Sequence, residues 1–187
     1  TSSLLQLASS TLNMSPGETM KHSQTLYQNG YITYMRTDSR EYSKQFLEYA
    51  EKYITTKYGQ GSQMSNLQTL ENKSTSNPHE AIRVTQLVLQ TINTENTRTL
   101  SLYKLIWRNT IESCMEDYKY NQYEINISSP IKALYSHMLD IPTKYGWKTI
   151  EEKRPIIEIQ SELCGLKLKL ESQQNTEVAY NKIETKC

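Results

Sequence analysis

SPGETMKHSQTLYQNG, residues 15–30, contains both a start signal and a stop signal for a helix. Its first four residues combine a serine N-cap, a proline at the first helical position and a glutamate at the third, which is the arrangement of a capping box. Its last two residues, Asn29 and Gly30, favour a left-handed helix stop. The sequence therefore predicts a helix over residues 16–29.

Three further helices are predicted from apolar residues that recur at helical spacing. Ser2 or Ser3 can cap the first of them, and Gly59 ends the second. The segment 59–78 is rich in Gln, Ser, Asn and Thr, which predicts a mobile surface loop. The three helices span about residues 2–12, 43–58 and 97–115, and the expected buried face of the last consists of Leu100, Tyr103, Leu105, Ile106 and Ile111.

After Asp117 apolar and polar residues alternate, which is typical of half-buried strands. Trp107, on the long helix, is expected in the core, and so is Trp147, in a strand. The predicted fold class is α+β, with a mainly helical domain over residues 1–117 followed by a partial antiparallel β domain over residues 118–187. The predicted strands cover about residues 118–127, 133–139, 155–159 and 166–170.

Composition favours a folded, soluble chain and excludes several classes of function. The 187 residues carry 21 Lys and Arg against 20 Asp and Glu, a net charge of +1, so any binding to nucleic acid must be local. The 3 cysteines have no C-x-x-C spacing, which argues against a structural zinc and a disulfide framework and favours a reducing compartment. No apolar run approaches the length of a membrane span.

The ten residues GYITYMRTDS, 30–39, hold a phenol, a guanidinium, a carboxylate and several hydroxyls directly after a predicted helix stop. In an extended segment Tyr34 and Arg36 point to the same face, so both can converge on one anion. A nucleophilic tyrosine needs a neighbouring cation or base, because its phenol is almost fully protonated at neutral pH, and Arg36 is the obvious cation. Taken alone, the pattern also fits a buried tyrosine beside a surface pair of Arg36 and Asp38.

A second cluster, HEAIRVT at residues 79–85, follows the polar segment. His79 and Arg83 are four residues apart, so on a helix they would share a face and could grip one phosphate. A lone histidine in such a run is more often a cap or a surface residue, so this spacing is weak evidence by itself.

Together these motifs resemble those of type IA DNA topoisomerases. Residues 30–39 are similar to that family's Gly-x-Ile-Thr-Tyr-x-Arg-Thr-Asp-Ser signature, and residues 79–85 to its His-Glu-Ala-Ile-Arg-Pro-Thr signature, with Val84 standing in place of proline. The opening TSSL and the helical segments 16–29 and 102–108 also resemble the family, so the likeness covers about residues 1–116 in detail.

The resemblance implies a winged-helix-like domain whose Tyr34 attacks one DNA strand. The attack would form a 5'-phosphotyrosine, another strand would pass through the gap, and religation would relax negative supercoils without ATP. Arg36 and His79 would act with Tyr34 as catalytic residues on the scissile phosphate. The residues implied in substrate binding or support are Arg83, Asp38, Thr33 and Tyr27.

The resemblance also implies what the chain needs to function. In complete enzymes of the family a preceding domain supplies carboxylates for Mg²⁺, and this chain has no acidic cluster that resembles it. Asp38 and Glu41 are too few carboxylates to replace such an oxygen-rich site. No cofactor is expected in this chain, which starts without Met, resembles an excised piece and would be inactive alone. Expected partners are single-stranded or underwound DNA and the remaining domains of the same enzyme, with no membrane, inside the cell.

Two other functions fit the residues. The first is a non-catalytic winged-helix module in which the same groups hold phosphates without covalent chemistry, and the second is a plain interaction domain. Tyr34 beside Arg36 separates catalysis from binding, because a binding module could carry Phe at position 34 without loss.

Overall fold

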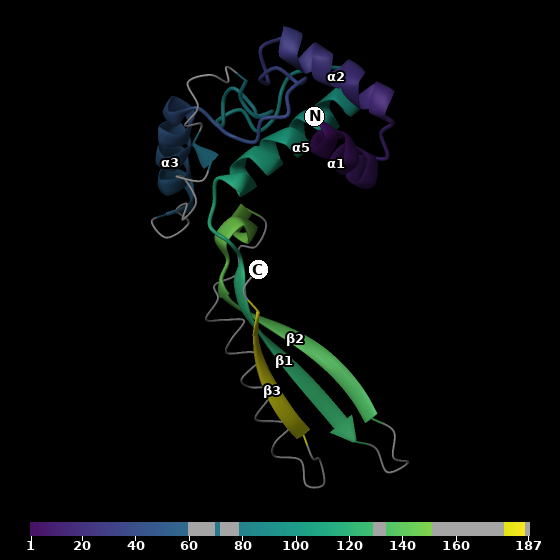
Figure 1. Cartoon of the computed structure of the whole chain (residues 1–187), viewed down its shortest axis with the longest axis vertical. Helices are drawn as coiled ribbons and strands as arrows, with labels where there is room; N and C mark the ends of the chain where they lie inside the picture. Colours follow the sequence, from purple (N-terminus) through teal and green to yellow (C-terminus); the bar gives the residue numbers. More distant parts are fainter. Residues whose placement is uncertain (60–69, 72–78, 129–133, 151–177, 186–187) are drawn as a thin grey trace. The chain divides into compact units, whose positions relative to one another are not determined.

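The computed structural model describes residues 1–59, 70–71, 79–128, 134–150 and 178–185. The chain divides into two compact units, Thr1–Glu116 and Asp117–Cys187. The first is helical and the second contains a β-sheet, so the α+β, mainly helical class predicted from the sequence is confirmed (Figure 1). In the described parts of the chain, no helix combines the length and apolarity needed to cross a membrane.

The four predicted helices are all present in the first unit. They are α1 (Ser2–Leu12), α2 (Pro16–Gln28), α3 (Lys44–Tyr58) and α5 (Thr97–Ser113). The Ser15 side chain accepts a 3.2 Å hydrogen bond from the Glu18 N–H, as a capping residue should. Gly30 has φ +72°, the left-handed conformation expected after α2. The N-cap of α1 is Thr1 rather than Ser2 or Ser3.

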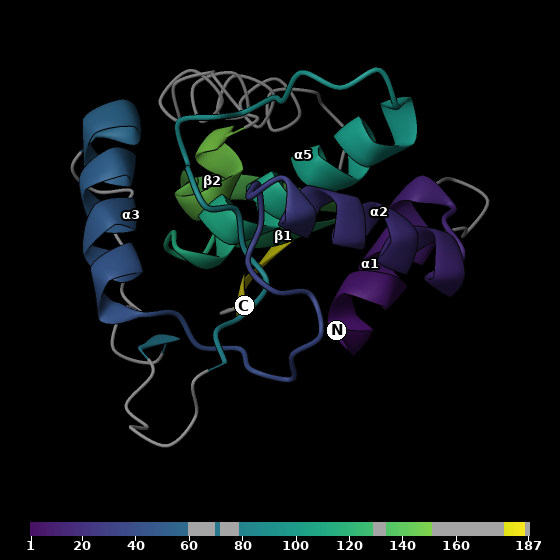
Figure 2. The same ribbon diagram turned by 90° about the horizontal axis from the view of Figure 1, so that it is seen from above.

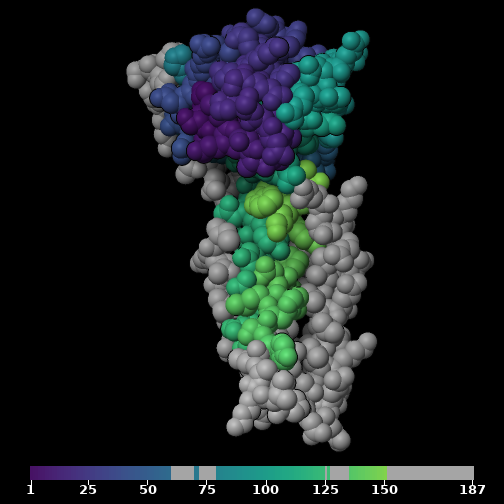
Figure 3. Space-filling view, turned by 90° about the vertical axis from the view of Figure 1, so that its right-hand side faces the viewer, coloured from purple at the N-terminus to yellow at the C-terminus, as the bar shows by residue number. Residues whose placement is uncertain are grey.

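The core of the first unit forms around α5, which packs against both α1 and α2 (Figure 2). The two N-terminal helices form a continuous outer surface, coloured purple in the space-filling view (Figure 3). Leu100 and Leu105, expected in the buried face, are half-buried, because that face is rotated toward neighbouring positions of the helix. The buried apolar residues of α5 are Leu102, Tyr103, Ile106, Trp107 and Ile111.

Residues 31–33 and 83–85 lie side by side as antiparallel extended segments. The Thr33 N–H donates to the Arg83 carbonyl at 2.9 Å, and the Thr85 N–H donates to the Tyr31 carbonyl at 3.0 Å. Ile32 pairs with Val84 in an isolated bridge, and both side chains are buried. The condition under which His79 and Arg83 would share a helix face is therefore not met, because pairing with residues 31–33 holds this segment extended.

Most of the predicted loop at 59–78 lies outside the described residues. At its described positions, Leu70 accepts a 2.7 Å hydrogen bond from the Tyr42 N–H, and Glu71 pairs with Tyr42 in a parallel bridge. The buried face of α3 includes Phe46 and Leu47. Because Arg83 lies over the Phe46 ring, this helix packs against the segment that follows the loop.

Over its described residues, the second unit contains an antiparallel sheet of three strands in the order β2-β1-β3. Its strands are β1 (Lys119–Ser128), β2 (Leu134–Lys144) and β3 (Val178–Thr185). Tyr123 lies opposite Leu139 in the register of β1 and β2. Trp147 was expected in a strand but lies in a 3-10 helix, η1 (Gly146–Ile150), and is half-buried. The strands predicted at 155–159 and 166–170 fall outside the described residues, and β3 was not predicted.

Candidate active site

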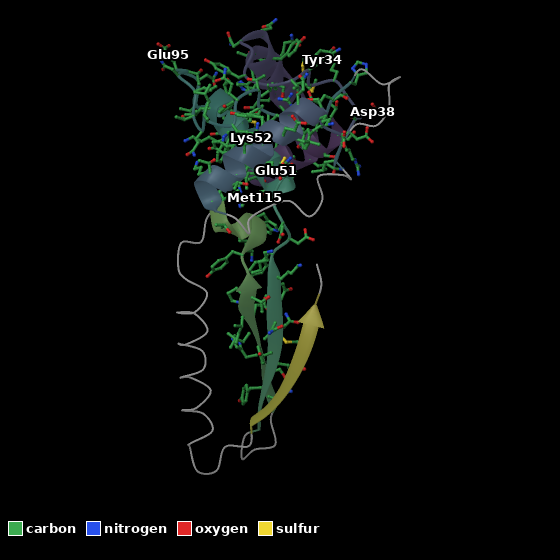
Figure 4. All side chains as sticks on the ribbon, turned by 90° about the vertical axis from the view of Figure 1, so that its left-hand side faces the viewer. Tyr34, Asp38, Glu51, Lys52, Glu95 and Met115 are labelled. Carbon is green, nitrogen blue, oxygen red and sulfur yellow. The ribbon has the colours of Figure 1, made fainter. Side chains whose placement is uncertain are left out.

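Exposed and buried side chains alternate along residues 34–38. Tyr34 is 42% exposed, whereas Met35 is 1% and Thr37 7% exposed. Arg36 and Asp38 are exposed as well, so the two inward side chains anchor a segment that presents Tyr34, Arg36 and Asp38 outward. Figure 4 shows Tyr34 and Asp38 at the periphery of the first unit. The alternative of a buried Tyr34 is therefore wrong.

The Tyr34 ring is held at its side by another tyrosine. Tyr27, in the last turn of α2, meets it edge to face with ring centroids 5.2 Å apart and planes at 65°. Such a contact restrains the ring. Among the described residues the Tyr34 hydroxyl has no hydrogen-bond partner, so it is free to meet a ligand.

Two buried tyrosines of the same unit differ from Tyr34. Burial raises the pKa of Tyr42 to about 12 and that of Tyr103 to about 12. The Tyr42 hydroxyl is paired with Ser113 at 2.9 Å, and the Tyr103 hydroxyl donates to the Leu89 carbonyl at 2.6 Å. Neither phenol is presented to a ligand, and both are harder to ionise than an ordinary tyrosine.

Thr33 joins the two motifs. Its hydroxyl donates to the Ala81 carbonyl at 2.8 Å and accepts from the Arg83 N–H at 2.9 Å. Together with the backbone bonds of the same segments, this side chain fixes the residue before Tyr34 to residues 81–83. Thr33 therefore supports the site through the backbone.

Arg36, Asp38 and His79 line one open hollow of about 380 Å³. Thr1, Ser2 and Thr37 complete its lining. The structure thus brings together three residues that the sequence placed in the site. Arg36 and Asp38 belong to the first motif, and His79 lies 41 positions beyond Asp38 in the second. A cation, a carboxylate and an imidazole around an open hollow can accommodate a phosphate group and exchange protons near it.

Arg83 was expected to contact substrate, but its guanidinium has partners inside the protein. It forms two hydrogen bonds of 2.8 Å with the Glu80 carboxylate and lies 3.9 Å from the centre of the Phe46 ring. Glu80 also accepts a 2.9 Å bond from the Ser43 N–H. Burial alone would raise the pKa of Glu80, but the bonds from Arg83 and Ser43 lower that pKa below its usual value. Arg83 does not line the hollow with Arg36 and His79.

Sequence reasoning missed Thr1. The Thr1 hydroxyl lies 2.9 Å from both the Met35 and the Thr37 carbonyl oxygens and accepts from the Thr37 N–H at 3.1 Å. It also missed Glu80 as the partner of Arg83. No local signal identifies the contacts of Thr1, because they join residues 34 and 36 positions apart.

The described residues contain no group of three or more His, Cys, Asp or Glu side chains placed to hold a metal ion. Within this part of the chain, then, the residues do not fit a Mg²⁺ site.

A family model described as DNA topoisomerase matches residues 1–186. The chain belongs to this DNA topoisomerase family. It is 42% identical over 130 residues to "DNA topoisomerase 1 type prokaryotic" of Acanthamoeba polyphaga mimivirus, covering 68% of this chain and 15% of that protein. It is 34% identical over 173 residues to "DNA topoisomerase 1" of Buchnera aphidicola subsp. Acyrthosiphon pisum, covering 87% of this chain and 20% of that protein. The chain therefore spans about a fifth or less of these relatives.

These matches confirm the type IA topoisomerase resemblance inferred from the motifs. Val84 stands where the type IA signature that residues 79–85 resemble has proline. Val84 is buried in the bridge with Ile32, and its N–H donates to the Thr110 hydroxyl at 3.4 Å. Proline has no N–H, so it could not make this contact with α5. The departure from the signature therefore adds a bond to the helical core.

Proposed function

We propose that this chain is the tyrosine-bearing part of a type IA DNA topoisomerase and that Tyr34 is its nucleophile. The Tyr34 Oη attacks a phosphorus atom of one DNA strand, forming the Oη–P bond while the P–O3' bond breaks. The phenol loses its proton, and the leaving 3'-oxygen gains one to become a hydroxyl. The product is a 5'-phosphotyrosine. Another strand passes through the break in the cleaved strand, and the 3'-hydroxyl then attacks the phosphotyrosine to rejoin the DNA.

The single observation that carries this proposal is the outward alternation of Tyr34 and Arg36 around the buried Met35. A phosphodiester that meets the phenol would lie near a guanidinium. The planar fork of Arg36 matches its non-bridging oxygens and stabilises the charge that grows there in the transition state. Arg36 has no hydrogen bond or ion pair among the described residues, so the ligand does not have to displace one.

The other residues take different roles in this proposal. His79 and Asp38 face the same hollow as Arg36, so His79 would contact the phosphate or exchange its proton while Asp38 orients a neighbouring cationic group. Arg83 would support the site without contacting the DNA, because its guanidinium pairs with Glu80 and lies over the Phe46 ring. Tyr27 and Thr33 would support the phenol and its backbone.

Religation would need no ATP, because the phosphotyrosine ester keeps the phosphodiester bond energy until the 3'-hydroxyl attacks it. The described residues do not form a site for Mg²⁺. In this proposal its carboxylates belong to other domains of the complete enzyme, and this chain is inactive without them. Its substrate is single-stranded or underwound DNA, bound locally by a chain whose net charge is +1.

The test is covalent trapping in the complete enzyme with a single-stranded oligonucleotide labelled at either end. The 3'-end label should become attached to the protein under denaturing conditions, whereas the 5'-end label should be released on a shortened strand with a 3'-hydroxyl. Tyr34→Phe should abolish the adduct and leave binding of the oligonucleotide within about three-fold. The control is Tyr135→Phe, which alters an exposed tyrosine of β2 and should leave the adduct intact.

Three results would contradict the proposal. An adduct that survives Tyr34→Phe would remove the nucleophile. Transfer of the 5'-end label would reverse the polarity of the bond. Tight binding by an enzyme that forms no adduct with either label would favour the non-catalytic binding module.

A further inference from the structure

Thr1 holds the backbone on both sides of Arg36. Its hydroxyl lies 2.9 Å from the carbonyl oxygens of Met35 and Thr37, and it has one proton to share between them. The same oxygen accepts from the Thr37 N–H at 3.1 Å. One side chain therefore contacts the residue before Arg36 and the residue after it.

The side chain of Arg36 has no comparable restraint. It is exposed, and among the described residues it makes no hydrogen bond and no ion pair. Its direction is thus set by its own backbone, which the inward side chains of Met35 and Thr37 and the Thr1 hydroxyl hold. Loss of the hydroxyl would release one restraint without changing a charge. The Thr1 amino group separately donates to the Thr37 carbonyl at 2.6 Å.

Thr1 is itself well anchored. Its carbonyl accepts from the Leu5 N–H at 3.1 Å, so Thr1 is the N-cap of α1. The helix α1 packs on α2 and α5, and its side chains Leu4 and Ala8 are buried. The Thr1 hydroxyl is thus held in place by a helix that belongs to the core of the first unit.

We propose that Thr1 is a positioning residue that orients Arg36 toward the phosphate without contacting the reacting atoms. The Thr1 hydroxyl keeps the guanidinium in the direction in which it meets the non-bridging oxygens, and a small error in such positioning slows chemistry more than it weakens binding. This inference rests on the proposed function of Tyr34 and Arg36.

The test compares Thr1→Val and Thr1→Ser in the complete enzyme. The first removes the hydroxyl at nearly constant shape, and the second keeps the hydroxyl. At saturating single-stranded oligonucleotide, Thr1→Val should slow adduct formation by about ten-fold or more, with oligonucleotide affinity within about three-fold. Thr1→Ser should stay within about three-fold of the parent rate. The matched control is Thr56→Val, an exposed threonine of α3 whose hydroxyl bonds within its own helix, and it should leave the rate unchanged.

A merely structural role is separated by repeating Thr1→Val in an Arg36→Ala enzyme. If Thr1 acts through Arg36, adding Thr1→Val to the Arg36→Ala enzyme should slow adduct formation by less than about two-fold further. The inference is overturned if Thr1→Val leaves the rate unchanged, if Thr1→Ser is as slow as Thr1→Val, or if the two substitutions slow the reaction multiplicatively. Tyr34→Phe is measured beside them, since an adduct that survives it would defeat the proposed function and not this inference alone.

Discussion

The Thr33 hydroxyl accepts a 2.9 Å hydrogen bond from the backbone N–H of Arg83, 50 positions further along the chain. The same hydroxyl donates to the Ala81 carbonyl. The residue that precedes the proposed nucleophile is therefore tied to the second motif of the site, and the two motifs form one structural unit.

Thr33→Val should destabilise the first unit by about 1–3 kcal/mol, because it leaves a half-buried N–H and a carbonyl without their partner. The measurement is the free energy of unfolding of this chain in urea. Thr33→Ser, which keeps the hydroxyl, should recover most of the loss, and Thr56→Val on the surface of α3 should change little. Equal stability of the valine and serine variants would show that the hydroxyl contributes nothing.

Gly30 and Gly17 form a natural pair for a backbone experiment, because a Cβ at either position meets nothing within 4 Å. Gly30→Ala should destabilise the chain by about 1 kcal/mol, since φ is +72° there. Gly17→Ala should stabilise it by roughly 0.5–1 kcal/mol, because Gly17 lies in the first turn of α2. Thermal unfolding of the two variants should shift in opposite directions, and equal shifts would contradict this prediction.

Glu80 should make stability depend on pH. The pKa of Glu80 in the folded chain is lowered below the usual 4.5. The bonds of its carboxylate to Arg83 and Ser43 therefore contribute stability above pH 4.5, and this contribution is lost as the pH falls through the folded pKa. Glu80→Gln should therefore cost about 1–3 kcal/mol at pH 7 and progressively less as the pH is lowered from 4.5 through the folded pKa. Urea unfolding of the parent and the variant across that range measures the difference. The matched control is Glu48→Gln, at an exposed position of α3, which should change the free energy of unfolding by less than about 0.5 kcal/mol at pH 7.

Arg36→Ala should separate catalysis from stability. Arg36 is exposed and unpaired among the described residues, so its removal should change the free energy of unfolding by less than about 0.5 kcal/mol. Adduct formation by the complete enzyme should fall by about a hundred-fold or more, since the charge on the phosphate loses its cation. A large loss of stability with normal adduct formation would assign Arg36 to the fold instead.

Cys114 should be unreactive in the folded chain. Burial raises the pKa of its thiol to about 12, so almost no thiolate is present at pH 8. In a variant carrying Cys164→Ser and Cys187→Ser, iodoacetamide should leave Cys114 unmodified in buffer and alkylate it fully in urea. Mass spectrometry gives the extent of modification, and rapid alkylation of the folded chain would show that the thiol is accessible.

Local signals predicted the helices well. Ser15 caps α2 as its spacing with Glu18 indicates, and Gly30 ends that helix with a positive φ. The Glu18 side chain, which a capping box would direct to the backbone N–H of Ser15, instead accepts a 2.7 Å hydrogen bond from Arg98. This contact lies 80 positions away in the sequence, so helix periodicity could not have revealed it.

The second motif shows where local reasoning failed. The four-residue spacing of His79 and Arg83 would place them on one face only in a helix, but residues 83–85 pair with residues 31–33 and are extended. As a result His79 faces the hollow with Arg36, whereas Arg83 turns to Glu80 and Phe46. A spacing has meaning only after the secondary structure is known, and here tertiary pairing decided it.

The sequence by itself determined the helix limits, the change to alternating strands after Asp117 and the family to which the chain belongs, because these depend on neighbouring residues and on motifs. The tertiary structure alone decided that Thr33 joins the two motifs, that Arg83 is held inside and that Thr1 grips the backbone around Arg36. Those contacts join residues brought together by the packing of a helical core. Hydrogen-bond partners distant in the chain leave no periodic trace in it.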